Sequence, residues 1–253
     1  MDRYTHIYRL EKQKKQRLRK YLPDHLVDYA YKNYSQYLIN GLKKNFLLSK
    51  ILKEKYFWKS KFKTTNKTLD PRPETEIIIE ECLKKYKNDP RKLKTLDLCS
   101  GTGCIGISLQ NEINTHVTFT DISKDALKVC KYNVRIHKNF SKSQFFLSDM
   151  FLNLPNKKYN ICVSNPPYLT KEEVENNDFL RQDPYISLYG GHDGLEFYRI
   201  ISENLKEYIT EYAFIEICSQ KLEKTLNIFK NKFQNIEVIR DLNNLPRVII
   251  IKI

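Results

Sequence analysis

Four consecutive residues, Asn165-Pro166-Pro167-Tyr168, combine hydrogen-bond acceptors with a rigid backbone and an aromatic ring. An amide or aromatic amine nitrogen is planar and a poor nucleophile, because its lone pair is delocalised. If the Asn165 side-chain oxygen and the Pro166 carbonyl oxygen each accept one of its N–H groups, the nitrogen is held toward an electrophile and its developing positive charge is stabilised. The prolines stiffen these acceptors, and Tyr168 can stack on the planar group. The tetrapeptide predicts substitution at a planar nitrogen, against the alternative of a proline-rich loop.

Glycine is used sparingly in this chain. Of the seven glycines, six form two clusters, Gly101, Gly103 and Gly106, then Gly190, Gly191 and Gly194. At the first cluster a predicted strand ends, small residues follow, and a helix is predicted to begin at Cys104. Small residues let the backbone approach a ligand closely, next to a helix N-terminus. The turn predicts a nucleotide-like cofactor, although dinucleotide-binding folds and ligand-free tight turns share the pattern.

Acidic residues stand at the ends of the next two predicted strands. Asp121 lies about 20 residues beyond the glycine turn, where a carboxylate can accept hydrogen bonds from both hydroxyls of a ribose. Its alternative role is to cap the next helix, which Ser123 is also placed to do. Asp149 and Met150 end the third strand, where such folds contact an adenine ring; the alternative for Asp149 is an ordinary turn residue.

From about residue 94 onward, short apolar runs alternate with amphipathic stretches. The predicted strands span residues 95–99, 116–120, 144–147, 159–164, 213–218, 236–239 and 247–253, and the predicted helices begin at 104 and span 124–137, 197–209 and 221–232. This alternation predicts a parallel sheet with helices on both faces. The short turn between the last two strands predicts a hairpin with one antiparallel strand. Because the tetrapeptide follows the fourth strand, it emerges at the same edge of the sheet as the glycine turn.

The N-terminal part has a different pattern. Between residues 4 and 52, apolar residues recur three or four apart, for example Leu22, Leu26 and Ala30, which predicts short amphipathic helices. Aromatic and β-forming residues at 56–58 and 61–65 predict a short hairpin. Pro71 and Pro73 disfavour a helix in their own segment. Glu74 and Glu76, as acidic residues of a first turn, then predict that a helix begins there.

Composition limits the class of protein. Hydrophobic residues make up 41% and charged residues 29% of the chain, which is typical of a globular protein, and no run approaches the roughly 20 apolar residues of a membrane helix. The six cysteines show no paired two-residue spacing, so we expect a reducing compartment and no metal site. Without an apolar secretory segment a cytoplasmic protein is expected, and the basic residues 12–20 leave an organelle as the alternative.

The formal net charge of +14 has two interpretations. A surplus of Lys and Arg gains affinity for phosphates and favours a partner such as nucleic acid or a ribonucleoprotein. Lys, Asn and Ile are abundant along the whole chain, however, and lysines spread over a surface are usually only solvated. Direct binding of nucleic acid therefore stays open and is not required by the chemistry.

From about residue 56 to the C-terminus, the sequence resembles the HemK/PrmC-type release-factor glutamine methyltransferases. The resemblance is carried by Phe57-Trp58 with Phe62, by the segments 71–76, 97–103, 121–127, 165–168 and 191–198, and by the ending from Asp241 to Arg247-Val248. It implies an α/β, doubly wound, seven-stranded, mostly parallel sheet of the Rossmann-like, class I methyltransferase type. It also implies a small helical substrate-recognition domain over 1–54, shorter than is usual in the family, a hairpin linker over 55–70 and the S-adenosylmethionine-dependent methyltransferase domain over 71–253.

The resemblance further implies methyl transfer from S-adenosylmethionine to the side-chain amide of the glutamine in a release factor's Gly-Gly-Gln loop, which tunes peptide release. The expected substrate-binding residues are Asn165, Pro166, Pro167 and Tyr168, with Asn165, Pro166 and Tyr168 as the catalytic ones. The expected cofactor-binding residues are Cys99, Ser100, Gly101, Thr102, Gly103, Asp121, Asp149, Met150 and Asn165. We expect a monomer without a metal or a membrane partner.

One position departs from the family's pattern, because the first cofactor glycine is Cys99 here. Cysteine fits this position if its backbone angles are ordinary and is strained there if φ is positive.

Other functions share parts of these motifs. Adenine-methylating enzymes of DNA and RNA also carry Asn-Pro-Pro-Tyr, and such an enzyme would explain the charge of +14 directly. The segment 72–76, Arg-Pro-Glu-Thr-Glu, resembles release-factor enzymes more than ribosomal-protein glutamine methyltransferases, which carry a different segment there. The remaining alternative is a basic, ribosome-associated binding protein that has kept the fold without the activity.

Overall fold

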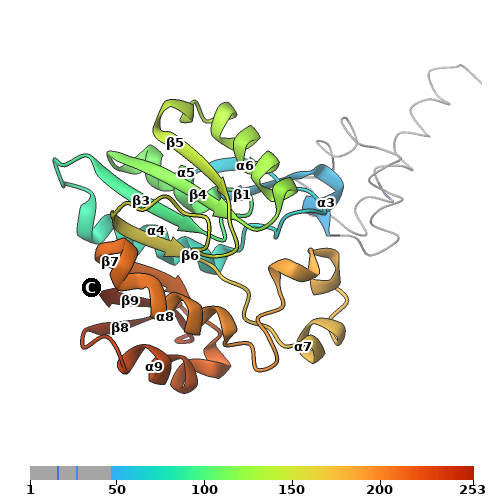
Figure 1. Cartoon of the computed structure of the whole chain (residues 1–253). Helices are drawn as coiled ribbons and strands as arrows, with labels where there is room; N and C mark the ends of the chain where they lie inside the picture. The colour runs from blue at the N-terminus through green and yellow to red at the C-terminus, as the bar shows by residue number, and fades with distance from the viewer. Residues whose placement is uncertain (1–15, 17–26, 28–46) are drawn as a thin grey trace, which may run out of the picture. The chain divides into compact units, whose positions relative to one another are not determined.

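The computed structural model describes residues 16, 27 and 47–253 of the chain (Figure 1). The chain divides into two compact units, Met1–Lys53 and Glu54–Ile253. In the first unit, α3 (Leu48–Leu52) is described, and most of the predicted helical domain over 1–54 lies outside the described residues.

A seven-stranded sheet forms the centre of the second unit, in the order β5-β4-β3-β6-β7-β9-β8. Its strands are β3 (Leu93–Leu98), β4 (Thr115–Asp121), β5 (Ser143–Leu147), β6 (Tyr159–Ser164), β7 (Ile209–Glu216), β8 (Ile236–Arg240) and β9 (Pro246–Lys252). Strand β9 runs antiparallel to both of its neighbours, and the other paired strands are parallel. The predicted seven-stranded, mostly parallel sheet with a closing hairpin is confirmed.

Helices cover both faces of the sheet (Figure 1). They are α4 (Glu76–Tyr86), α5 (Cys104–Glu112) and α6 (Lys124–Ile136) on one face, and α8 (Glu196–Tyr208) and α9 (Leu222–Lys230) on the other. A hydrophobic cluster lies on each face of the sheet. Adjacent residues of β6 belong to different clusters, since Ile161 packs with α4, α5 and α6 and Cys162 packs with α8 and α9. A strand buried on both faces reads as a continuous apolar run, which is why the central strands could be recognised in the sequence.

Asn133 links the short hairpin of β1 (Glu54–Phe57) and β2 (Ser60–Lys63) to α6 and the glycine turn. The Asn133 side chain on α6 accepts a hydrogen bond from the Lys63 amide at 2.8 Å and donates one to its carbonyl at 3.0 Å. The same side chain donates to the Thr102 carbonyl at 2.9 Å. The hairpin, α6 and the glycine turn therefore hold one another in place.

Two features differ from the pattern predicted by the sequence. Strand β7 begins at Ile209, four residues before the predicted 213, because Ile209 is buried and pairs with Tyr159. The polar residues Thr210 and Glu211 interrupt the apolar run, so the sequence did not indicate that the strand begins at Ile209. Short helical turns also follow the tetrapeptide, namely α7 (Lys171–Glu175), η3 (Leu180–Gln182) and η4 (Tyr185–Ser187), which are too short to show a helical period.

Within the described part of the chain, no helix is long and apolar enough to cross a membrane. The same residues contain no group of histidine, cysteine and acidic side chains arranged to hold a metal ion. All six cysteines are free thiols, and five of them are buried.

Candidate active site

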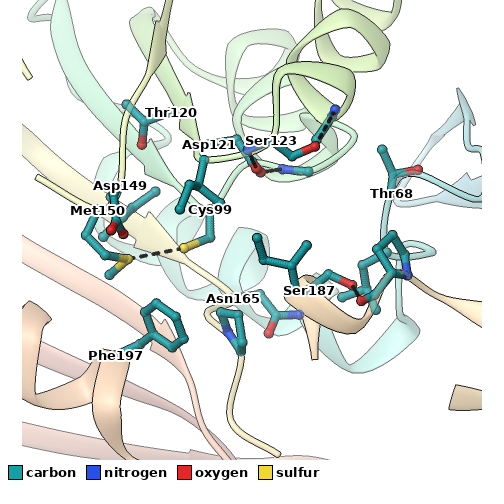
Figure 2. Close-up of a pocket in the computed structure, with 18 of the residues that line it drawn as sticks. Thr68, Cys99, Thr120, Asp121, Ser123, Asp149, Met150, Asn165, Ser187 and Phe197 are labelled. Carbon is teal, nitrogen blue, oxygen red and sulfur yellow. Dashed lines mark hydrogen bonds between the residues drawn. The ribbon is translucent and has the colours of Figure 1, made fainter. Parts of the chain in front are cut away.

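The carboxyl ends of four neighbouring strands surround one pocket, which we call the first pocket (Figure 2). The residues predicted from the sequence that line it are Cys99, Gly101, Asp121, Asp149, Met150, Asn165 and Pro167. Its lining also includes residues that were given no role from the sequence, among them Thr68, Leu69, Ile122, Ser187 and Phe197. The strand ends bring the two parts of the predicted site together, the glycine turn and the Asn-Pro-Pro-Tyr segment.

The glycine turn exposes its backbone to the first pocket. Gly101 has a φ of +53°, and a Cβ added there would meet no atom within 4 Å, so this side of the turn is open. Gly103 serves packing instead, because a Cβ there would lie 2.6 Å from the Cys130 Sγ. The side chains of Ser100 and Thr102 are buried, and neither residue lines the pocket. Only part of the predicted turn is therefore available to a ligand.

Asp121 joins the end of β4 to the glycine turn. Its Oδ2 accepts a hydrogen bond from the Gly101 amide and its Oδ1 one from the Ser123 amide, both at 2.8 Å. Ser123 is the residue that caps α6, since its Oγ accepts from the Ala126 amide at 3.2 Å. Burial raises the pKa of Asp121, and the two backbone hydrogen bonds oppose that shift. Each carboxylate oxygen keeps a second acceptor site for a hydroxyl of a ligand.

Two residues with left-handed backbones lie side by side in one wall of the first pocket. Cys99 has a φ of +60° and Met150 a φ of +47°, and the Cys99 thiol lies 3.6 Å from the Met150 sulfur (Figure 2). The Ser148 hydroxyl donates to the Met150 carbonyl at 2.8 Å, which fixes this turn, and Asp149 is exposed beside it. Cys99 thus occupies the strained conformation that glycine would adopt without cost.

Replacing Cys99 with Gly is expected to raise the free energy of unfolding by about 1 kcal/mol, because a non-glycine residue in the left-handed region costs that order of energy. Denaturant unfolding of the two proteins measures the difference. The control is Cys82→Gly inside α4, where glycine should lower stability through helix propensity and lost packing. If Cys99→Gly destabilises the chain as Cys82→Gly does, the strain at Cys99 is refuted.

Asn165 lies where the first pocket meets a second one. The second pocket is lined by Leu69, Arg72, Asn165, Pro166, Pro167, Tyr168, Leu169, Leu180, Ser187 and Leu188. Asn165, Pro167, Leu69 and Ser187 line both pockets, so the two adjoin. The Asn165 Nδ2 donates a hydrogen bond to the Thr75 hydroxyl at 3.1 Å, and its Oδ1 accepts none from the residues that the structure describes. The amide oxygen is therefore available to a ligand held between the pockets.

The buried carboxyl of Glu216, at the end of β7, accepts two hydroxyls from the site. Thr75 donates to its Oε2, and the Tyr168 hydroxyl donates to its Oε1 at 3.2 Å. Burial raises the pKa of Glu216 to about 7, and both of these hydrogen bonds oppose the shift. Neither Thr75 nor Glu216 was assigned a role from the sequence. The sequence offered one signal for Glu216: it is an acidic residue at the end of an apolar strand, at the same edge of the sheet as the rest of the site.

The loop that follows Asn165 is held by the second glycine cluster and by a lysine. A Cβ added to Gly190 would lie 2.6 Å from the Pro167 carbonyl oxygen, so only glycine allows this approach. The Gly190 amide donates to the Leu169 carbonyl at 2.8 Å, and the Lys221 ammonium donates to the Tyr168 carbonyl at the same distance. The second glycine cluster thus fixes the backbone of the Asn-Pro-Pro-Tyr segment.

The segment 70–76 links the loop before η4 and the β1–β2 hairpin to the site. The Arg72 guanidinium forms an ion pair with Asp183, whose side chain is fully buried and also accepts the Asp70 amide. The Glu76 carboxylate accepts the Trp58 amide of the hairpin at 2.7 Å. Arg72 thereby anchors the loop that leads to η4, whose residue Ser187 lines both pockets.

Comparison with known proteins places the chain among methyltransferases. Residues 68–182 match the methyltransferase small domain family. The release factor glutamine methyltransferase of Thermodesulfovibrio yellowstonii is 33% identical over 214 residues, 81% of this chain and 76% of that protein. The protein of the same name from Buchnera aphidicola is 34% identical over 233 residues, 89% of this chain and 81% of that protein.

A solved structure extends the comparison to the fold. The T. thermophilus 16S rRNA N2 G1207 methyltransferase in complex with AdoMet and guanosine has a TM-score of 0.56 and 13% identity, and the match covers 79% of this chain and 49% of that one. At this identity the likeness concerns the fold alone, which is the Rossmann-like methyltransferase fold predicted from the sequence. The sequence relatives confirm the resemblance inferred from the motifs: the chain belongs to the release factor glutamine methyltransferase family.

Proposed function

We propose that this chain transfers the methyl group of S-adenosylmethionine to the side-chain amide nitrogen of the glutamine in the Gly-Gly-Gln motif of a translation release factor. The observation that carries the proposal is the position of Asn165, whose free Oδ1 lies where the two pockets adjoin. An acceptor at that position can hold an amide nitrogen from one pocket toward a methyl donor in the other.

The first pocket fits the methyl donor. The open side of Gly101 admits a ligand against the backbone, and Asp121 offers acceptor sites for two ribose hydroxyls. Ile122, Met150 and Phe197 supply apolar surface for a purine ring. When bound, S-adenosylmethionine supplies an electrophilic methyl group on a positively charged sulfur. We assign this pocket Cys99, Gly101, Asp121, Asp149 and Met150 as its contacts.

The second pocket is suited to the glutamine amide. The Asn165 Oδ1 and the Pro166 carbonyl accept the two N–H groups, which orients the nitrogen lone pair and stabilises the positive charge that develops on it. No residue has to remove a proton before transfer, because the nitrogen becomes acidic once it is methylated. Tyr168, whose hydroxyl is anchored on Glu216, presents its ring to the same pocket.

The choice of a release factor as substrate is supported by the relatives of that name, which align with most of the chain. We assign the segment 1–54 to recognition of this protein substrate, 55–70 to the hairpin linker and 71–253 to methyl transfer. We propose that the enzyme acts as a monomer. It works where translation terminates, in a cytoplasm or in a translating organelle.

The test is transfer of a labelled methyl group from S-adenosylmethionine to four acceptors: a purified release factor, the same factor with its Gly-Gly-Gln glutamine replaced by alanine, RNA and DNA. We expect label on the intact factor and none on the alanine variant. Label on RNA or DNA alone would instead establish a nucleic-acid methyltransferase. Calorimetry that finds no binding of S-adenosylmethionine would favour the non-enzymatic binding protein.

A further inference from the structure

Glu216 is an acidic residue inside the protein whose partners are hydroxyls. Its side chain is buried, with 3% of the residue's surface exposed, at the last position of β7. The Thr75 and Tyr168 hydroxyls donate to its two oxygens, and no cation of the described residues lies within salt-bridge distance of it. A buried carboxyl without a cation is costly to keep, which points to a role beyond packing.

The carboxylate determines which way the hydrogen bonds of its neighbours run. An ionised carboxyl can only accept, so the Thr75 hydroxyl must give its single proton to Glu216. The Thr75 oxygen can then only accept, and it does so from the Asn165 Nδ2 at 3.1 Å. An amide whose nitrogen faces Thr75 must turn its oxygen to the opposite side. The orientation of Asn165 is thus set two hydrogen bonds away.

We propose that Glu216 is a positioning residue, which acts through the Thr75 hydroxyl to keep the Oδ1 of Asn165, rather than its Nδ2, facing the nitrogen that is to be methylated. The inference rests on the proposed function, since it names what orients the acceptor in that reaction. It also gives Thr75, within the Arg-Pro-Glu-Thr-Glu segment, a defined task at the site.

Protonation of Glu216 removes this control. A protonated carboxyl can donate to Thr75, which frees the Thr75 proton for the Asn165 Oδ1 and allows the amide to turn over. Besides burial, Glu74 on η1 (Pro73–Thr75) raises the pKa of Glu216 and Arg247 on β9 lowers it. Three further groups close by stay neutral near pH 7 because burial raises their pKa: Tyr168, Tyr198 and Cys218.

The first experiment follows kcat with pH. Because the pKa of Glu216 is raised to about 7, the wild-type kcat should rise as the pH increases through that value. In Glu216→Gln, which cannot ionise, kcat should be independent of pH between about pH 6 and about pH 8, the range around that pKa. An acid limb that persists unchanged in Glu216→Gln would overturn the proposal.

The second experiment separates the hydroxyl of Thr75 from its bulk. Thr75→Val should lower kcat by about tenfold to a hundredfold through misorientation of the acceptor, whereas Thr75→Ser, which keeps the hydroxyl, should restore it. The matched control is Thr225→Val on α9, a buried threonine whose hydroxyl has no described partner. If Thr75→Val and Thr225→Val have equal activity, the relay through Thr75 does not operate.

A third measurement needs no methyl acceptor. In protein labelled with nitrogen-15 on asparagine side chains, the Asn165 NH2 signals should shift with the titration of Glu216, and the shift should vanish in Glu216→Gln. Signals that do not respond to pH in the wild type would overturn the inference even if the release factor is methylated. Conversely, a titration without methylation of the factor would support the relay and refute the proposed substrate.

Discussion

Replacing Asn165 with Ala is expected to lower kcat by a factor of about one hundred to one thousand, because it removes a preorganised acceptor that stabilises charge developing in the transition state. The dissociation constant of S-adenosylmethionine should change by no more than about twofold, since the substitution leaves the proposed cofactor contacts Cys99, Gly101, Asp121, Asp149 and Met150 in place. Single-turnover kinetics and calorimetry measure the two quantities separately.

Asn156→Ala is the matched control for this substitution. Asn156 is exposed on the loop before β6, so its replacement should leave both kcat and cofactor binding unchanged. An Asn165→Ala protein that retains more than about a tenth of the wild-type kcat would contradict the role assigned to the amide, because loss of a single well-placed hydrogen bond to developing charge costs more than that.

Asp121→Ala is expected to weaken the binding of S-adenosylmethionine by about a hundredfold or more. Each hydrogen bond to a charged acceptor contributes about 1.5–3 kcal/mol, and the substitution removes the acceptor for two hydroxyls. It also releases the Gly101 amide, which the carboxylate holds at 2.8 Å. The prediction concerns binding rather than transfer, so isothermal titration calorimetry is the appropriate measurement.

The control for Asp121 is Asp125→Ala, in the first turn of α6, the helix that follows β4. Asp125 is half exposed and forms only a surface ion pair with Lys128 among the described contacts, so its loss should leave cofactor affinity unchanged. Equal affinity in Asp121→Ala and in the wild type would mean that the carboxylate is a structural link between β4 and the glycine turn, and not a ligand for the ribose.

Much of the methyltransferase domain could be predicted because its signals are local. The central strands are continuous apolar runs since both faces are buried, and the tetrapeptide directly follows one of them, β6. Ser123 and Asp121 could be distinguished in principle by the short reach of a helix cap, and the structure assigns the cap to Ser123. Residues at strand ends are brought together by the parallel sheet itself, whatever the loops do.

Contacts between distant segments could not be predicted in this way. Thr75 and Glu216 are 141 residues apart in the chain, and neither belongs to a recognisable spacing with Asn165. The close approach of Gly190 to Pro167 could not be predicted either, because the intervening loop is made of short helical turns without a regular period. The positive φ of Cys99 could not be predicted from the sequence either, because cysteine adopts ordinary backbone angles at most turns.

The most direct test of the proposed activity is mass spectrometry of a release factor after incubation with this chain and S-adenosylmethionine. We predict a single added methyl group on the glutamine of the Gly-Gly-Gln motif, which forms about a hundredfold to a thousandfold more slowly when Asn165→Ala replaces the wild-type protein. A release factor that stays unmethylated, or one methylated at another residue while that glutamine is unchanged, would contradict the proposal.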